Sequence, residues 1–600
     1  MKAFFRFFLA LVLLWLPLLA QSASAQPTGQ TYTVNTLSDN TTDDNFCTLR
    51  EAILAANNAN PIIYNGNCGA PSNGDDTIIF ALNGTITLST RLPSVQDAST
   101  TGKLTIDGDG DIAISGNNNL QIMSASIGAN LTLKNLTITQ SGGPYLGSGL
   151  FNNRGTVSLI NVTFSDNKGQ AIYNWLGTLD IRGSTFHNNE ESVVIRSDMG
   201  VVNVKDSRFF NNRKGVIRID GSAENVSILN VKDSIFSNNE TSGSGGAIDL
   251  YLAEATIEDT RFSNNTAAGG GGAIQAVGSK LTLTRAEFSN NKARNGGALH
   301  ILAGGSPTRM SEVAIRESTF AGNEASEGGA IDLYGKLDIA SCQFSGNKAK
   351  ATGPNTGKGG GIQSRPGSTL SVDGSYFLNN QADVRGGALV NNGTMTVRES
   401  AFLGNQANYG GGIANINGKG TIVNSTLANN DGTSGDGIYA QGEELKVINS
   451  TVSGNNGQGI RLESGTLILQ NTIVANHADG DCIKTGGSLS DSRHNLIESS
   501  IYIYTCGLSH GSDGNLVGRD PQLGSLTGSP AYLPLQVDSP AIDAGDNTIC
   551  ASSLVNNRSQ NGVTRPVDGD GNGVAVCDIG AYELAQGITR LFLPLITRSP

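Results

Sequence analysis

The chain has 600 residues and a formal net charge of −12, with only 15% charged residues, and 78 of its residues are glycine. Glycine averages about 7% in proteins and no collagen period is present here, so the excess glycine must serve turns. The acidic balance disfavours binding to the phosphate backbone of nucleic acids. Aromatic residues at 6% and hydrophobic residues at 38% favour many short strands around a narrow core over a thick globular core.

The first 25 residues have the pattern of a cleavable signal peptide. Lys2 and Arg6 supply a positive start, residues 7–20 are mostly apolar, and Ala23-Ser24-Ala25 offers a small-residue cleavage site. A membrane anchor is the alternative, but the apolar stretch is shorter than the ~20 residues that a span needs. We therefore expect a secreted or cell-surface protein whose mature chain has no transmembrane segment.

Residues 26–100 are predicted to cap one end of the fold. Thr48 and Glu51 have the spacing of a capping box, and a short amphipathic helix would follow them. Such a helix can cover the open end of a stack of strands. Arg50 and Glu51 could indicate catalysis, but capping and ion pairing explain them better. The segment around Cys47-Thr48-Leu49-Arg50-Glu51-Ala52 resembles the bacterial CSLREA domain, which is associated with exported β-helix proteins and implies no catalytic residues.

Residues 101–505 contain one repeating unit with a spacing near 25 residues. Alternating apolar residues come first, then Phe-x-x-Asn, then Gly-Gly-Ala-Ile or a close variant. The phenylalanine of the motif stands at Phe164, Phe186, Phe209, Phe236, Phe262, Phe288, Phe320, Phe344, Phe377 and Phe402. The glycine element begins at Gly245, Gly271, Gly296, Gly328, Gly386 and Gly410.

This unit predicts an all-β fold, a right-handed parallel β-helix of the pectin-lyase-like type. Alternation with period two indicates strands, and Asn and Gly in the gaps suit tight turns. We expect the phenylalanines to stack inside, the asparagines to form a ladder in one turn, and the glycine pair to mark a bend that a side chain would obstruct. The coupled motifs resemble the repeats of chlamydial polymorphic membrane proteins, which implies a surface protein.

Residues 506–586 do not continue the repeating unit and are predicted to form a small β-rich domain. The stretches Ser539–Asp546 and Cys577–Glu583 resemble the choice-of-anchor C-terminal domain of bacterial surface proteins. The tail at 587–600 resembles no sorting signal. Asp568, Asp570 and Asn572 alternate as in the first half of a calcium loop, but the closing glutamate would fall at Ile579, so Asp578 or Glu583 would have to replace it. A plain Asp/Gly turn is the preferred interpretation, and a calcium site is the alternative. We expect no cofactor, and calcium at this loop is the alternative.

Seven cysteines stand in the chain, and export makes disulfides plausible. Pairing of sequence neighbours gives Cys47–Cys68, Cys482–Cys506 and Cys550–Cys577, with Cys342 left alone among the repeats. The histidines His477, His494 and His510 stand near the second pair. They lack the spacing of a zinc site, so a disulfide with surface histidines is the preferred interpretation.

Alignment of the repeats places one polar residue per coil just after the glycine element, in a row that should face outward. The row consists of Asp249, Gln275, His300, Asp332 and Gln363, which are candidate ligand-binding residues. Tyr334 and Arg365 follow closely. With His300 and Asp332 they form a candidate catalytic set, because carbohydrate-active β-helices such as pectate lyases work from a sheet face with carboxylates and a basic residue or Tyr. An exposed strand row is also ordinarily polar without any function.

Three functions are compatible with this sequence. We favour a non-catalytic exported protein for adhesion or glycan binding, whose partner is a polysaccharide or a glycan on a host or neighbouring cell. A polysaccharide lyase, hydrolase or epimerase on the same scaffold is the second interpretation, and a passive structural surface rod is the third.

Overall fold

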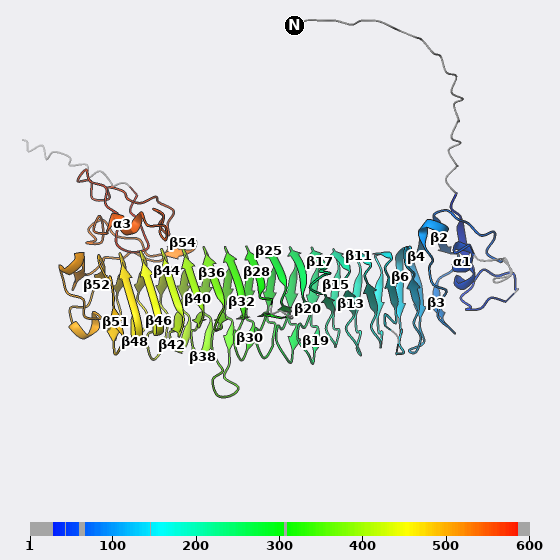
Figure 1. The fold of residues 1–600 in the computed structure, drawn as a ribbon, viewed down its shortest axis with the longest axis horizontal. Helices are drawn as coiled ribbons and strands as arrows, with labels where there is room; N and C mark the ends of the chain where they lie inside the picture. Colours follow the sequence, from blue (N-terminus) through cyan, green and yellow to red (C-terminus); the bar gives the residue numbers. More distant parts are fainter. Residues whose placement is uncertain (1–27, 43, 59–66, 145, 305–308, 586–600) are drawn as a thin grey trace, which may run out of the picture.

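The computed structural model describes residues 28–42, 44–58, 67–144, 146–304 and 309–585. These residues form a long rod that coils through about 17 turns as a right-handed parallel β-helix, with a smaller domain beside one end (Figure 1). The predicted fold class is therefore confirmed. The predicted signal peptide at 1–25 and the tail at 587–600 lie outside the described residues.

Each coil contains strands of three columns, A, B and C, and each strand stacks in parallel on the equivalent strand of the next coil. The strands of column A follow the glycine element. They are β5 (Met123–Ala125), β7 (Leu150–Asn153), β10 (Ile172–Trp175), β13 (Ile195–Asp198), β16 (Ile217–Asp220), β20 (Ile248–Tyr251), β24 (Ile274–Val277), β27 (Leu299–Leu302), β31 (Ile331–Leu333), β35 (Ile362–Ser364), β39 (Leu389–Asn391), β43 (Ile413–Ile416), the first parts of β46 (Ile438–Ile448) and β48 (Ile460–Gln470), and β50 (Cys482–Lys484).

Column B follows column A within each coil and contains the alternating apolar residues of the repeat. It comprises β1 (Thr31–Val34), β2 (Asp76–Phe80), the first parts of β4 (Leu104–Ser115) and β6 (Asn130–Thr139), β8 (Thr156–Ile160), β11 (Thr178–Arg182), β14 (Val201–Lys205), β17 (Ser227–Lys232), β21 (Ala253–Glu258), β25 (Lys280–Thr284), β28 (Ser311–Arg316), β32 (Gly335–Ala340), β36 (Thr369–Asp373), β40 (Thr394–Arg398), β44 (Lys419–Val423), the second parts of β46 and β48, and β51 (Ser488–Leu489).

Column C carries the phenylalanine of each Phe-x-x-Asn motif. It comprises β3 (Gly84–Thr87), the second parts of β4 and β6, β9 (Thr163–Ser165), β12 (Thr185–His187), β15 (Arg208–Phe210), β18 (Ile235–Ser237), β22 (Arg261–Ser263), β26 (Glu287–Ser289), β29 (Thr319–Ala321), β33 (Gln343–Ser345), β37 (Tyr376–Leu378), β41 (Ala401–Leu403), β45 (Thr426–Ala428), β47 (Thr451–Ser453), β49 (Ile473–Ala475), β52 (Leu496–Ile497) and β53 (Leu516–Val517). Short strands between columns C and A pair with each other, namely β19 (Glu240–Thr241), β23 (Thr266–Ala267), β30 (Glu324–Ala325), β34 (Lys348–Ala349), β38 (Gln381–Arg385) and β42 (Gln406–Tyr409).

The interior of the rod is held together by stacked copies of the same side chain. The motif phenylalanines from Phe164 to Phe402 form one face-to-face stack, with ring centroids 4.6 to 5.1 Å apart. Since this separation matches the ~4.8 Å distance between parallel strands, the rings can pack without distorting the ladder. The predicted phenylalanine column is confirmed.

The motif asparagines form a second column, which lies buried in the turn after column C. From Asn167 to Asn455, each Nδ2 donates to Oδ1 of the asparagine in the next coil, over 2.8 to 3.0 Å. The glycine pair also behaves as predicted, because a Cβ on Gly272 would lie 2.1 Å from the carbonyl oxygen of Gly297. Both expected columns are therefore confirmed as structural features.

The N-terminal end of the rod is covered by α1 (Leu49–Ala56), whose capping box of Thr48 and Glu51 is present as predicted. Leu49, Ala52 and Ile53 are buried against the first coils. Arg50 forms an ion pair of 2.8 Å with Asp39, so this arginine holds the cap in place rather than facing a ligand. A second short helix, α2 (Ala98–Thr101), follows the cap.

The C-terminal domain lies along one flank of the rod instead of extending it (Figure 1). The 3-10 helices η2 (Tyr502–Tyr504) and η3 (Ser512–Gly514) belong to the last coil of the rod, before β53. The described elements of the C-terminal domain are the strands β54 (Thr527–Gly528) and β55 (Ala531–Tyr532), and α3 (Asn547–Cys550). Arg558 pairs with Glu399 at 2.6 Å, and Gln560 accepts a hydrogen bond from Thr426. These contacts join residues more than 130 positions apart, so the domain and the coils form one packed unit.

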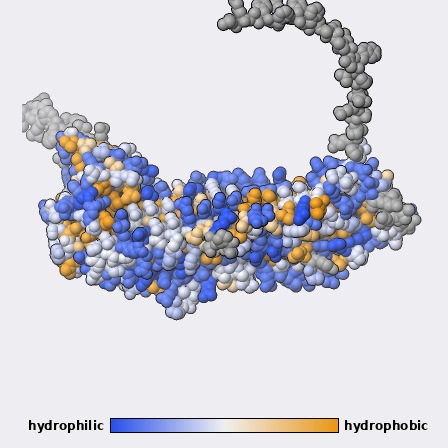
Figure 2. Space-filling model, in the orientation of Figure 1, coloured by the Kyte–Doolittle hydropathy of each residue, from blue (hydrophilic) through white to orange (hydrophobic). Residues whose placement is uncertain are grey.

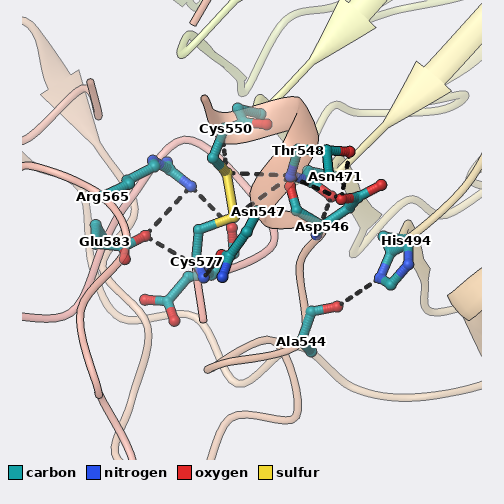
Figure 3. Close-up of a disulfide and its surroundings, with 12 residues drawn as sticks. Asn471, His494, Ala544, Asp546, Asn547, Thr548, Cys550, Arg565, Cys577 and Glu583 are labelled. Atoms are coloured by element: carbon teal, nitrogen blue, oxygen red, sulfur yellow. Dashed lines mark hydrogen bonds and ion pairs between the residues drawn. A yellow bond between two sulfur atoms is a disulfide. The ribbon is translucent and has the colours of Figure 1, made fainter. Parts of the chain in front are cut away.

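Polar groups organise much of the interior of this domain. Arg565 and Glu583 form a fully buried ion pair of 3.4 Å, close to the disulfide that links Cys550 and Cys577 (Figure 3). Arg565 also donates to the carbonyl oxygen of Asp578. Among the described residues, no helix is long and apolar enough to cross a membrane.

Candidate functional site

Column A presents one outward-facing side chain from the second position of each strand. Strand register places Asp249, Gln275, His300, Asp332 and Gln363 in adjacent coils, so the predicted alignment is confirmed. We call this line the outward row. Toward the N-terminus it continues through Arg218, Arg196, Tyr173 and Phe151. The sequence alignment missed these four because their coils lack the Gly-Gly-Ala-Ile element.

The expectation that the whole row is exposed is wrong. His300 is 7% exposed, Asp332 0% and Gln363 2%, because the turns that precede the strands of column A close over them. Gly270 illustrates this, since a Cβ there would lie 1.8 Å from Nδ1 of His300. Solvent reaches the row at Asp249, whose side chain is 21% exposed.

A chain of hydrogen bonds connects the middle of the row and determines the state of its histidine. Nε2 of Gln275 donates to Asp249 over 3.2 Å, so its Oε1 faces Nδ1 of His300 at 3.3 Å. An amide oxygen only accepts, and Nδ1 must therefore carry the proton. Burial lowers the pKa of His300, which favours the neutral ring. Nε2 then points a lone pair toward Asp332 at 3.7 Å, too far for a direct hydrogen bond.

Arg365 is held by two carboxylates. It donates to both oxygens of Asp332 over 2.8 and 3.0 Å, and lies 3.1 Å from an oxygen of Glu327. Its guanidinium carbon sits 5.1 Å from the centre of the Tyr334 ring. Although burial opposes it, the hydrogen bond and charge of Asp332 raise the pKa of Arg365 above its ordinary value. An arginine paired in this way is a poor proton acceptor.

Glu327 belongs to this cluster, and sequence reasoning missed it. It stands in the turn directly before Gly328, a position that the repeats fill with unrelated side chains such as Asn295, Lys358 and Arg385. Burial raises the pKa of Glu327 to about 7, against the opposing charges of Arg365 and Lys358. The structure thus brings His300, Asp332, Tyr334 and Arg365 together as predicted, but in a paired and mostly buried arrangement.

An open cleft of about 530 Å³ lies on the same face, nearer the N-terminal end. Its lining includes Arg196, Arg218 and Asp249 of the outward row, together with Lys168 and Lys214 from the turns that precede the strands of column A. Next to the cleft, Phe151 and Tyr173 stack at 5.5 Å, and Tyr173 donates to Asp198 over 2.7 Å. Burial and the charge of Asp198 raise the pKa of Tyr173 to about 12, so its hydroxyl stays protonated.

The predicted calcium loop adopts a different set of neighbours from the one expected. Asp568 and Asp570 lie close to Asp543, with one ligand oxygen of each within 4.8 Å of the others. Asp578 is instead buried, and it accepts hydrogen bonds from the backbone of Asp543 and Leu584. Burial and the charge of Glu583 raise its pKa. Asp543 therefore lies where the sequence suggested Asp578. The side-chain amide of Asn572 donates a hydrogen bond to Asp570.

The three disulfides join the predicted neighbours, Cys47–Cys68, Cys482–Cys506 and Cys550–Cys577. Cys342 is the free, buried thiol. It occupies a column of serine side chains between columns B and C and accepts a hydrogen bond from the backbone of Ser318. Burial raises its pKa to about 11, which makes it an inert structural thiol.

The histidines near the second disulfide have separate roles. His477 ends the asparagine ladder, with its Nε2 3.1 Å from Nδ2 of Asn455, and its Nδ1 lies 2.9 Å from Asp481. His494 contacts the carbonyl oxygen of Ala544 (Figure 3). Within the part of the chain that the structure describes, no histidine or cysteine joins a group of metal-ligand atoms. The predicted disulfide Cys482–Cys506 is present, whereas the expectation of surface histidines is wrong for His477, whose side chain is buried.

Two family models match the chain. A model of the right-handed β-helix region matches residues 151–315, and a model of the Chlamydia polymorphic membrane protein repeat matches residues 341–365. The resemblance of the repeats is therefore confirmed over that segment. The resemblances of the two ends to the CSLREA and choice-of-anchor domains stay predictions. Comparison with curated proteins finds no match.

The solved structures that resemble this chain include three polysaccharide lyases. Pectate lyase Pel9A is 12% identical with a TM-score of 0.20, covering 94% of this chain and 98% of that chain. A mannuronic acid specific family 6 lyase from human gut microbiota is 10% identical with a TM-score of 0.23, covering 76% and 91%. Alginate lyase AlyGC is 9% identical with a TM-score of 0.19, covering 74% and 97%. These values assign no activity to the present chain.

Proposed function

We propose that the protein is an exported cell-surface or secreted rod that binds glycans without converting them, and so serves adhesion. The cleft beside Arg196, Arg218 and Asp249 carries this proposal. It is open, it has room for part of a glycan chain, and its lining is mainly polar. Hydrophilic side chains also cover most of the face seen in Figure 2. Three disulfides suit an oxidising, extracellular compartment.

The rigidity of the rod supports binding in preference to catalysis. Parallel strands place successive side chains of the outward row about 4.8 Å apart, which offers a linear polymer a series of evenly spaced contacts. Gln275 engages Nδ1 of His300, and Asp332 pairs with Arg365. Nε2 of His300 has no hydrogen-bond partner among the described residues but is buried, so a ligand does not reach it. A preformed polar surface loses little entropy when it binds, whereas a catalytic site also needs a free acid or base.

A turnover and binding screen tests this function. The purified protein is mixed with acidic and neutral polysaccharides, with calcium and with chelator, while reducing ends, unsaturated-sugar absorbance and binding are followed. We expect binding to at least one glycan without product. Failure to bind any glycan would leave the passive rod as the remaining interpretation.

A polysaccharide lyase, hydrolase or epimerase is a second candidate, favoured by one observation. Glu327, with a pKa of about 7, is the kind of carboxylic acid that could exchange a proton near neutral pH. Under this alternative, product forms in the screen and disappears in His300→Ala and Glu327→Gln variants. Product formation would overturn the non-catalytic proposal.

A further inference from the structure

We propose that the cleft takes an anionic segment of a polysaccharide, recognised through its carboxylate or sulfate groups. The inference rests on the glycan-binding function proposed above and specifies its ligand class. Four cationic side chains line the cleft, namely Lys168, Arg196, Lys214 and Arg218, against the two carboxylates of Glu191 and Asp249. This concentration of positive charge stands out on a chain whose net charge is −12.

The acids that pair with the two arginines do not cancel this charge at the surface. The side chains of Arg196 and Arg218 are 37% and 47% exposed, whereas those of their partners Asp198 and Asp220 are 16% and 15% exposed. The carboxylates lie beneath and the guanidiniums face solvent. An incoming anion therefore meets the positive groups first, with the paired acids serving to hold them in position.

The arginines also keep donors available for a ligand. Arg196 and Arg218 donate to their aspartates through Nε, and Nη1 of Arg218 lies 3.8 Å from Asp249, beyond hydrogen-bond distance. A guanidinium has five N–H donors in a fork that fits carboxylate and sulfate oxygens. Strand register places the two arginines in adjacent coils. Two anionic groups of one polymer chain could therefore each contact one of the arginines.

Lys168 and Lys214 line the cleft from the turns that precede the strands of column A. Both are exposed, and across the described ranges neither amine lies within ion-pair distance of a carboxylate. Lys168 lies one residue after Asn167 of the asparagine ladder, and Lys214 lies two residues after Asn212, two coils further along. The cleft thus offers cations from several successive coils to a chain laid parallel to the rod.

The binding experiment compares four polymers on the same protein: polygalacturonate, dextran sulfate, neutral dextran and poly-glutamate. The variant Lys168→Glu/Lys214→Glu reverses the two unpaired charges. Its matched control, Lys348→Glu/Lys484→Glu, reverses two exposed lysines outside the cleft. Lys168→Gln/Lys214→Gln provides a milder change if reversal disturbs folding, which circular dichroism would detect.

We expect the two anionic polysaccharides to bind at least tenfold more tightly than dextran. The charge-reversal variant should lose at least tenfold in affinity, the glutamine variant less, and the control almost nothing. Raising the salt from about 0.05 to about 0.5 M should weaken the wild type more than the charge-reversal variant, because exposed charges are screened.

Three results would contradict the inference, in distinguishable ways. Equal binding of dextran, unaffected by the cleft variants, would overturn the anionic ligand class and leave glycan binding intact. Binding of poly-glutamate as tight as that of polygalacturonate would assign the cleft to acidic peptides instead. Absence of binding to every polysaccharide would overturn both this inference and the proposed function.

Discussion

Replacing Arg365 by leucine should destabilise the middle of the rod strongly. Asp332 is fully buried and receives two hydrogen bonds from Arg365, over 2.8 and 3.0 Å. Removal of one partner of such a pair leaves an uncompensated buried charge, which costs about 3–5 kcal/mol. The double variant Asp332→Asn/Arg365→Leu removes the charge of Asp332 but keeps Glu327, which lies 3.1 Å from Arg365 and has a pKa of about 7, so it should recover part of the loss. The coupling between the two substitutions then measures the pair itself.

Hydrogen exchange is the suitable assay, because an array of repeats need not unfold in one step. The relevant amides are those of β27, β31 and β35, followed as a function of denaturant. Arg261→Leu is the matched control. Its ion pair with Glu287 is exposed on both sides and should contribute no more than about 1 kcal/mol. The reasoning is refuted if Arg365→Leu costs no more than this control, or if the double variant is no more stable than the single one.

The remaining predictions concern a buried acid, the asparagine ladder, the acidic loop and the free thiol. Because burial raises the pKa of Glu327 to about 7, its folded form binds a proton more tightly than its unfolded form. The stability that it contributes is therefore present below about pH 4.5 and is lost as pH rises toward 7. Glu327→Gln should flatten the stability of the surrounding coils between pH 5 and 8, and an unchanged profile would contradict this. Asn291→Ala removes side-chain bonds to Phe262 and two ladder neighbours and should cost about 2–4 kcal/mol by denaturation; a loss below about 1 kcal/mol would argue against a cooperative ladder. Calcium should raise the melting temperature of the wild type but not of Asp568→Asn if the loop binds it, and indifference to calcium and chelator would remove that prediction. Cys342→Ser should change stability by less than about 1 kcal/mol, since serine fills the equivalent position in neighbouring coils.

Much of the architecture could be predicted because it follows from short-range pattern. Period-two alternation sets strands, and the repeated Phe-x-x-Asn sets two columns whose members stack on their own copies. The capping box of Thr48 and Glu51 needs only a spacing of three residues. The disulfides join neighbouring cysteines, 21 to 27 positions apart, so proximity along the chain was a sufficient guide. A periodic fold turns local sequence directly into spatial neighbours.

The accessibility of the predicted site was decided by tertiary structure alone. Alignment could place His300 and Asp332 in one row, but whether a turn closes over them depends on the backbone path of adjacent coils, as at Gly270. Glu327 joined the cluster because a turn of another coil holds it beside Arg365, although its own position has no consistent residue type. The exposed cleft lies further along the same face, where coils without the double glycine leave Arg196 and Arg218 uncovered.

The sequence by itself therefore determined the strands, the stacked interior, the helical cap and the cysteine pairs, since each depends on spacing within one repeat or between adjacent ones. Tertiary structure decided which polar groups meet solvent, which carboxylates gain a partner and where the C-terminal domain rests. Those outcomes depend on contacts such as Arg558 with Glu399 and Asp543 with Asp568, which no local pattern encodes. Burial and charge pairing are properties of the assembled surface, and only the packed coils bring the groups concerned together.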